Sequence, residues 1–177
     1  WKDLHFVSCG ADALLEEVAN GFERRTGVRV CEVYGQSEVV AMSHSNPLHR
    51  IKSGSFGIPV CSVHGAILHP DKDEYLLPDE VGEIAVMAPT VMKGYWKHPE
   101  ENREKFSRIG DRVWMRTGDL GRMDDEGYFY FYDRKRDMIK YKGHAVFARE
   151  VEETIKEHPA VKEVAVVGVR DPAVGEN

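Results

Sequence analysis

Hydrophobic positions in the first fifty residues follow two different periods. The apolar run 4–8 predicts a short strand, and apolar residues at helical spacing then predict a helix over 12–25 with Asp12 as its N-cap and one buried face. Gly27 lies just past the expected helix end, where a glycine commonly stops a helix. The β-branched run 28–33 predicts a second strand. Together these elements predict an α/β unit whose ligand-binding loops follow the strands.

Residues 54–133 show a different pattern, in which short β-branched runs are separated by proline, glycine and polar turns. The predicted elements are strands over 60–68 and 81–87, a short helix over 99–106 and an aromatic strand over 128–132. The aromatic strand could be covered on both faces, so packing alone explains its composition. This pattern predicts a small antiparallel, β-barrel-like subdomain.

The polar and basic stretch 133–137 is the predicted domain boundary. The elements predicted after it are a hairpin around Lys142 and Gly143, a helix over 148–158 and a strand over 164–169. The predicted fold class is therefore α/β with a small β-barrel-like subdomain, followed by the start of a small α+β domain.

Composition narrows the class of protein. With 42% hydrophobic and 31% charged residues, the 177-residue chain can bury a real core and keep a soluble surface. The net charge of −6 opposes binding to nucleic acid or anionic membranes, which requires a basic surface. Three widely spaced cysteines (Cys9, Cys31 and Cys61) predict buried thiols of a reduced, cytoplasmic protein. Neither a membrane-spanning run nor a signal peptide is recognised, and the sequence does not indicate an oligomeric state.

Four short segments carry the candidate chemistry. They are Tyr34-Gly35-Gln36-Ser37-Glu38, Arg116-Thr117-Gly118-Asp119-Leu120, Asp133-Arg134-Lys135-Arg136-Asp137 and Lys140-Tyr141-Lys142-Gly143-His144. In this order they resemble the motifs of the adenylate-forming superfamily, which includes acyl-CoA synthetases, firefly luciferase and peptide-synthetase adenylation domains. A Thr-Gly-Asp segment alone arises easily by chance, whereas the ordered set is specific. The resemblance extends to Met92-Lys93-Gly94-Tyr95-Trp96 and covers nearly the whole chain.

The resemblance implies that the parent protein activates a carboxylic acid with ATP to give acyl-AMP, which a thiol then attacks. The nearest type is an AMP-forming acid–CoA ligase for a fatty acid. Two alternatives stay open: an adenylyltransferase that loads a carrier protein, and a catalytically silent nucleotide- or partner-binding module. The family's phosphate loop and late catalytic lysine are not among these residues. The 177 residues alone are therefore expected to lack ligase activity.

The same resemblance implies a division of the chain. Residues 1–133 would end the large N-terminal domain, with the α/β unit over 1–50 and the β-rich subdomain over 54–133. Residues 134–177 would begin the small C-terminal domain. Because the chain opens without methionine and stops just after a predicted strand, both ends are expected to be cut.

The resemblance also assigns the first segment. Glu38 would be a ligand of Mg²⁺ on the ATP phosphates, although an isolated glutamate is more often a solvated surface residue. The Ser37 hydroxyl would contact the α-phosphate. Tyr34 would offer an aromatic face to adenine, and Gly35 would let the backbone approach the nucleotide. Taken alone, Tyr34 would more often be a core residue.

The remaining nucleotide contacts come from other parts of the chain. Gly10 and Ala11 match the position of the family's adenine-binding loop. Asp119 would accept hydrogen bonds from the two ribose hydroxyls, against the alternative of a turn-forming aspartate. Arg134 would contact the ribose and phosphate of ATP or AMP. The prediction is that Glu38, Asp119 and Arg134 converge on one nucleotide, and their placement on opposite sides of the molecule would refute it.

The second half-reaction involves the predicted boundary and the loop after it. Arg136 occupies the hinge position about which the family's C-terminal domain swings, where the usual residue is aspartate or lysine. Lys142 and Gly143 fall on the loop that this swing carries into the site. Gly143 would then let the pantetheine arm of CoA approach closely, or it is an ordinary hairpin glycine.

Overall fold

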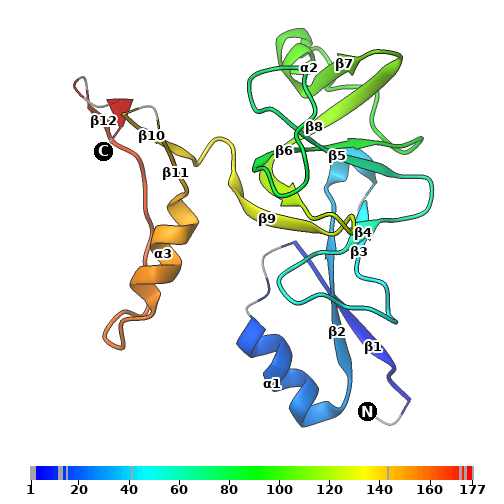
Figure 1. The fold of residues 1–177 in the computed structure, drawn as a ribbon, viewed down its shortest axis with the longest axis vertical. Helices are drawn as coiled ribbons and strands as arrows, with labels where there is room; N and C mark the ends of the chain where they lie inside the picture. The colour runs from blue at the N-terminus through cyan, green and yellow to red at the C-terminus, as the bar shows by residue number, and fades with distance from the viewer. Residues whose placement is uncertain are drawn as a thin grey trace.

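The computed structural model describes residues 3–11, 14, 16–40, 42–142, 144–171, 173 and 175–176, and three β-sheets organise this part of the chain (Figure 1). The first sheet has the order β1-β2-β3-β4. Its strands are β1 (Phe6–Cys9), β2 (Arg29–Tyr34), β3 (His44–Ser45) and β4 (Ile58–Pro59). Strands β1 and β2 are parallel and are joined by helix α1 (Glu16–Thr26), which agrees with the predicted α/β unit.

Helix α1 ends where the sequence predicts. Gly27 has a positive φ of 70°, and its backbone N–H donates to the Glu23 carbonyl at 2.8 Å. The predicted N-cap, Asp12, lies outside the described residues. The predicted buried face is only partly right, because Ala19 and Phe22 are half-buried whereas Val18 is 56% exposed. Among the described residues, α1 packs on β2, and no second layer covers Val18.

The second sheet is antiparallel and contains the main hydrophobic core. Its strands are β5 (His64–Leu68), β6 (Gly82–Met87), β7 (Phe106–Ile109), β8 (Arg112–Met123) and β9 (Phe129–Arg134), and helix α2 (Pro99–Lys105) precedes β7. The order is β5-β6-β8-β7, with β9 also paired to β8. Ile84 on β6 and Phe129 on β9 are fully buried in one core cluster. Only the start of the aromatic strand is fully covered: Tyr128 and Phe129 are buried, whereas Tyr130, Phe131 and Tyr132 are half-buried on β9, which lies at a sheet edge.

The third sheet lies beyond Arg134 and has the order β11-β10-β13-β12. Its strands are β10 (Ile139–Tyr141), β11 (His144–Val146), β12 (Arg170–Asp171) and β13 (Gly175–Glu176), and helix α3 (Ala148–Lys156) follows β11. Figure 1 shows this unit to one side of the second sheet. Helix α3 reaches back to β9, where the Arg149 backbone N–H donates to Asp133 Oδ2 at 3.3 Å and the Phe147 ring packs 5.8 Å from Tyr132.

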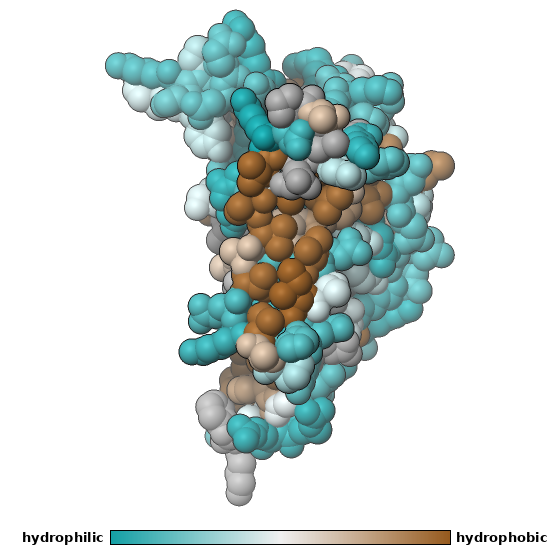
Figure 2. Space-filling view, turned by 90° about the vertical axis from the view of Figure 1, so that its left-hand side faces the viewer, coloured by the Kyte–Doolittle hydropathy of each residue, from teal (hydrophilic) through white to brown (hydrophobic). Residues whose placement is uncertain are grey.

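The strand predicted over 164–169 is wrong. This segment is extended but has no sheet partner among the described residues, and the nearest strand, β12, begins at Arg170. Its Val166 backbone N–H donates instead to the Glu152 side chain at 2.8 Å. Val167 and Val169 are 74% and 63% exposed. Figure 2 shows a hydrophobic strip on this side of the molecule. The segment 164–169 therefore contributes exposed apolar side chains, but it pairs with no described strand.

The three cysteines differ in how far they are buried. Cys31 is buried and Cys9 is half-buried, but Cys61 is exposed because it lies in the turn between β4 and β5. The prediction of three buried thiols is therefore wrong for Cys61.

Within the described residues, no helix combines the length and the apolar character needed to cross a bilayer.

Candidate functional site

The loops that follow β1 and β2 lie side by side. Because the two strands are parallel, with Cys9 opposite Glu32, both chains leave the sheet at the same edge. Gly10 packs so closely on β2 that a Cβ at this position would lie 2.7 Å from the Val33 carbonyl oxygen. Ala11 then turns away with a positive φ of 75°. The glycine is thus required by close backbone packing at the point where β2 delivers Tyr34.

Tyr34 joins this edge to the second sheet. Its hydroxyl donates a 2.6 Å hydrogen bond to Asp119 Oδ2, although the two residues are 85 positions apart. The Tyr34 ring stacks on Phe56 with centroids 4.5 Å apart, and His44 meets it edge-on at 5.8 Å. Burial raises the pKa of Tyr34 well above its usual value, and the Asp119 charge adds to this effect. The hydroxyl therefore stays a donor, and the packed ring fixes its direction.

Asp119 lies in β8 directly opposite Arg134 in β9. Burial raises the pKa of Asp119, while the hydrogen bond from Tyr34 and the charge of Arg134 act in the opposite direction. Arg134 is exposed, and its backbone N–H donates to Asp133 Oδ1 at 2.8 Å. No group in the described part of the chain donates a hydrogen bond to Asp119 Oδ1, so this oxygen can accept one from a ligand.

A buried ion pair supports the turn before Asp119. Glu83 accepts from Arg116 at 2.9 Å, from Lys135 at 3.1 Å and from the Gly118 backbone N–H at 3.1 Å. The Thr117 hydroxyl donates to the Ile84 carbonyl at 2.7 Å. Gly118 has a φ of 84°, a conformation that glycine adopts without steric cost. These contacts fix the start of the segment that presents Asp119.

Gln36 and Lys105 complete the link between the two sheets. The Gln36 amide nitrogen lies 3.3 Å from the Tyr34 hydroxyl and 3.3 Å from the Thr117 carbonyl oxygen. Lys105 Nζ, at the end of α2, lies 3.4 Å from Gln36 Oε1 and 3.2 Å from the same Thr117 carbonyl. Sequence reasoning gave neither residue a role. Gln36 stood inside a recognised segment, but nothing in the sequence connected Lys105 with it.

Glu38 lies in the short 3-10 helix η1 (Ser37–Val39), one turn beyond Tyr34. Its Oε1 accepts a 2.7 Å hydrogen bond from the Tyr95 hydroxyl, and its backbone carbonyl accepts from the Met92 N–H at 2.8 Å. The Tyr95 hydrogen bond lowers the pKa of Glu38, and burial together with Glu38 raises the pKa of Tyr95 to about 12. Glu38 is therefore an anion held in one orientation, beside the exposed Ser37.

The structure thus places four of the predicted residues at the strand ends: Gly10, Ala11, Tyr34 and Gly35. Asp119 accepts a hydrogen bond from Tyr34 and lies opposite Arg134 in the β8–β9 pair. It does not bring the C-terminal residues to them. Arg136 is exposed, and its Nε lies 3.5 Å from Oδ1 of the neighbouring Asp137. Lys142, with a φ of 49°, belongs to the β10–β11 hairpin, which Figure 1 places apart from β8. Gly143 lies outside the described residues.

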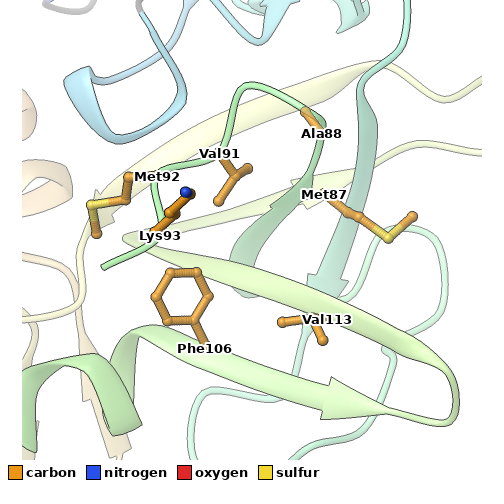
Figure 3. Close-up of a pocket in the computed structure, with 7 residues that line it drawn as sticks. All are labelled: Met87, Ala88, Val91, Met92, Lys93, Phe106 and Val113. Atoms are coloured by element: carbon orange, nitrogen blue, oxygen red, sulfur yellow. The ribbon is translucent and has the colours of Figure 1, made fainter. Parts of the chain in front are cut away.

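A cavity of about 370 Å³ lies between the segment 87–93 and the β7–β8 hairpin (Figure 3). It is lined by Met87, Ala88, Val91, Met92, Lys93, Phe106 and Val113. None of the predicted nucleotide-binding residues lines it. Apart from Lys93 the side chains that line it are apolar, which does not suit a polyphosphate, because a polyphosphate requires several hydrogen-bond donors or cations.

Comparison with known proteins gives consistent matches. The model of the AMP-binding enzyme family matches residues 2–96, more than half of the 177 residues, and the model of the AMP-binding enzyme C-terminal domain matches residues 150–177. A long-chain-fatty-acid–CoA ligase of Bacillus subtilis is 45% identical over 168 residues, which are 94% of this chain and 29% of that protein. A malonate–CoA ligase of Arabidopsis thaliana is 37% identical, covering 99% of this chain and 28% of that protein.

Solved structures agree with the sequence relatives. ATP-bound MatB from Rhodopseudomonas palustris superposes with a TM-score of 0.84 at 33% identity, over 96% of this chain and 33% of that one. The o-succinylbenzoate CoA synthetase of Bacillus subtilis, in complex with its acyl-adenylate intermediate, also gives 0.84, at 31% identity over 97% of this chain and 34% of that one. The chain therefore spans about a third of the length of the relatives it matches.

Proposed function

The chain belongs to the AMP-binding enzyme family, and we propose that it forms part of an AMP-forming acid–CoA ligase whose substrate is a fatty acid. In this reaction the carboxylate attacks the α-phosphate of ATP, giving acyl-AMP and pyrophosphate. The CoA thiol then attacks the acyl carbon and releases AMP. The ligase relatives and the ordered motifs support this proposal.

The observation that carries it is the 2.6 Å hydrogen bond between Tyr34 and Asp119. It joins two segments that the family uses for one nucleotide and leaves one carboxylate oxygen for the ribose hydroxyls. Tyr34 and Gly35 would lie along the adenine, and the loop at Gly10 and Ala11 would border it. Exposed beside Asp119, the Arg134 guanidinium would contact the ribose and phosphate.

Glu38 would hold Mg²⁺ at the other end of the site. The fit is good, since Tyr95 keeps the carboxylate ionised and occupies only one oxygen. No group of three His, Cys, Asp or Glu side chains suited to a metal is found among the described residues. Glu38 would therefore share the ion with ATP phosphates and water, as Mg²⁺ sites commonly do. The ion would neutralise phosphate charge, and the Ser37 hydroxyl would donate to the α-phosphate.

The finer domain division is also part of the proposal. Residues 1–133 would belong to the large domain, with a β-barrel-like subdomain over 54–133, and 134–177 would begin the small one. Arg136, exposed between the second and third sheets, would be the hinge. A swing there would carry the hairpin with Lys142 and Gly143 toward the nucleotide for the CoA step.

The test is an assay of the full-length protein with ATP, Mg²⁺, CoA and acids of increasing chain length. Release of AMP and pyrophosphate with acyl-CoA formation is expected, and no turnover of any acid would refute the proposal. A parallel reaction in which a phosphopantetheinylated carrier protein replaces CoA identifies the acceptor. Asp119→Asn should raise the KM for ATP strongly, whereas the exposed Asp125→Asn should not.

A further inference from the structure

Lys105 is a cation in an unusual position for a structural lysine. It ends helix α2, is half-buried, and contacts two neutral oxygens, Gln36 Oε1 at 3.4 Å and the Thr117 carbonyl at 3.2 Å. Both partners belong to the segments that hold Tyr34 and Asp119. The ammonium is thus fixed at the junction of the two halves of the candidate site.

The charge of Lys105 is not neutralised locally. Other buried or partly buried cations of the described chain have a carboxylate within ion-pair distance: Arg116 and Lys135 with Glu83, and Lys52 with Asp124. In the described part of the chain, Lys105 has no such partner within 4.0 Å. Its charge nevertheless helps to lower the pKa of both Glu38 and Asp119, so it lies within electrostatic range of the two carboxylates.

We propose that Lys105 binds the α-phosphate of the nucleotide. The argument rests on the proposed function: a nucleotide with its ribose at Asp119 and its metal-bound phosphates at Glu38 must pass its α-phosphate between them. That stretch is where the Lys105 ammonium lies, held by Gln36 and Thr117. An ammonium with three donors can keep one contact to Thr117 and direct another to a phosphate oxygen.

A purely structural lysine would behave differently. If Lys105 only anchored α2 to β8, its removal would weaken the fold and all ligands alike. If it binds phosphate, its removal affects AMP and spares adenosine, which has the same base and ribose without the charge. Arg103 provides a matched control, since it lies in the same last turn of α2 and pairs with the exposed Glu100 on the outer face.

The experiment measures equilibrium binding of AMP and adenosine to the full-length protein carrying Lys105→Met, Lys105→Gln or Arg103→Gln. Lys105→Gln keeps a donor for the Thr117 carbonyl but removes the charge, so it protects the test against a misfolded methionine variant. Both Lys105 variants should bind AMP about tenfold more weakly and adenosine within twofold of the parent. Arg103→Gln should leave both affinities unchanged.

The outcomes separate this inference from the proposed function. Unchanged AMP affinity in Lys105→Gln, or an equal loss of AMP and adenosine, overturns the role of Lys105. If the parent protein binds neither AMP nor adenosine, the nucleotide site itself is refuted, and the inference falls with it. Loss of AMP affinity in Arg103→Gln equal to that in Lys105→Gln shows general electrostatics and also overturns it.

Discussion

Replacing Tyr34 with phenylalanine removes one hydroxyl and leaves the ring that stacks on Phe56. The lost interaction is the 2.6 Å hydrogen bond to Asp119. Hydrogen bonds to charged groups contribute about 1.5–3 kcal/mol, and the half-buried position of Asp119 favours the lower end. Tyr34→Phe should therefore lower the free energy of unfolding by about 1.5 kcal/mol. Because Asp119 loses its orientation, the KM for ATP should rise by up to about tenfold.

The same variant should change the pH dependence in a defined direction. In the folded protein burial raises the pKa of Asp119, and the Tyr34 hydrogen bond opposes this rise. Without the hydroxyl the pKa of Asp119 rises further. In the proposed function the ionised carboxylate accepts both ribose hydroxyls, so the acid limb of kcat/KM for ATP should move to higher pH. The part of the stability deficit that depends on the Asp119 charge should be complete at pH values above the pKa of Asp119 in the variant. It should vanish as the pH falls below the pKa of Asp119 in the parent.

Tyr130→Phe is the matched control for these measurements. It removes a similar hydrogen bond in the same β8–β9 region, from the Tyr130 hydroxyl to Asp124 Oδ2 at 3.0 Å, and neither residue belongs to the candidate site. Chemical denaturation and initial rates against ATP concentration would be measured for both variants over a range of pH. A Tyr34→Phe enzyme with the parent's KM for ATP and the parent's acid limb would refute the role of this hydrogen bond.

Three other substitutions test separate contacts. Tyr95→Phe removes the main cause of the lowered pKa of Glu38, so the acid limb and the Mg²⁺ concentration for half-maximal rate should both rise; an unchanged Mg²⁺ requirement would contradict this assignment. Glu83→Gln leaves the buried Arg116 without its nearest charge partner and should cost about 3 kcal/mol in denaturant unfolding; a loss below 1 kcal/mol would show that the pair is dispensable. Gly10→Ala places a Cβ 2.7 Å from a β2 carbonyl and should cost about 2 kcal/mol in thermal or denaturant unfolding, and an undiminished midpoint would mean that the loop can move aside.

Local pattern predicted those elements whose partners are close in sequence. The parallel β1–α1–β2 unit and the glycine stop at Gly27 follow from periodicity and backbone preference, which act over a few residues. The segment 164–169 shows the limit of this reasoning. Its β-branched residues favour an extended backbone, but a strand also needs a neighbour, and no described strand lies beside it.

The candidate site shows the same division. Motifs identified Tyr34 and Asp119, yet their direct contact depends on how the first sheet packs against the second, which no local pattern encodes. Gln36 and Lys105 were missed for a related reason. Each is an ordinary polar residue that helps to join the two sheets, and the contact between them spans 69 positions of the sequence.

The two tyrosine–carboxylate pairs of the site have opposite electrostatic consequences, and this difference suits the proposed chemistry. At Asp119 burial dominates and raises the pKa. Neutral hydrogen-bond donors, such as the Tyr34 hydroxyl and the hydroxyls of a ribose, therefore stabilise the ionised form of this carboxylate. At Glu38 the Tyr95 hydrogen bond dominates and lowers the pKa, so the negative charge persists over a wide pH range. A ligand of Mg²⁺ must be anionic, whereas an acceptor for sugar hydroxyls benefits from a site that is partly shielded from water. In the proposed function this arrangement would orient a nucleotide, with the sugar at the more buried carboxylate and the metal-bound phosphates at the more exposed one.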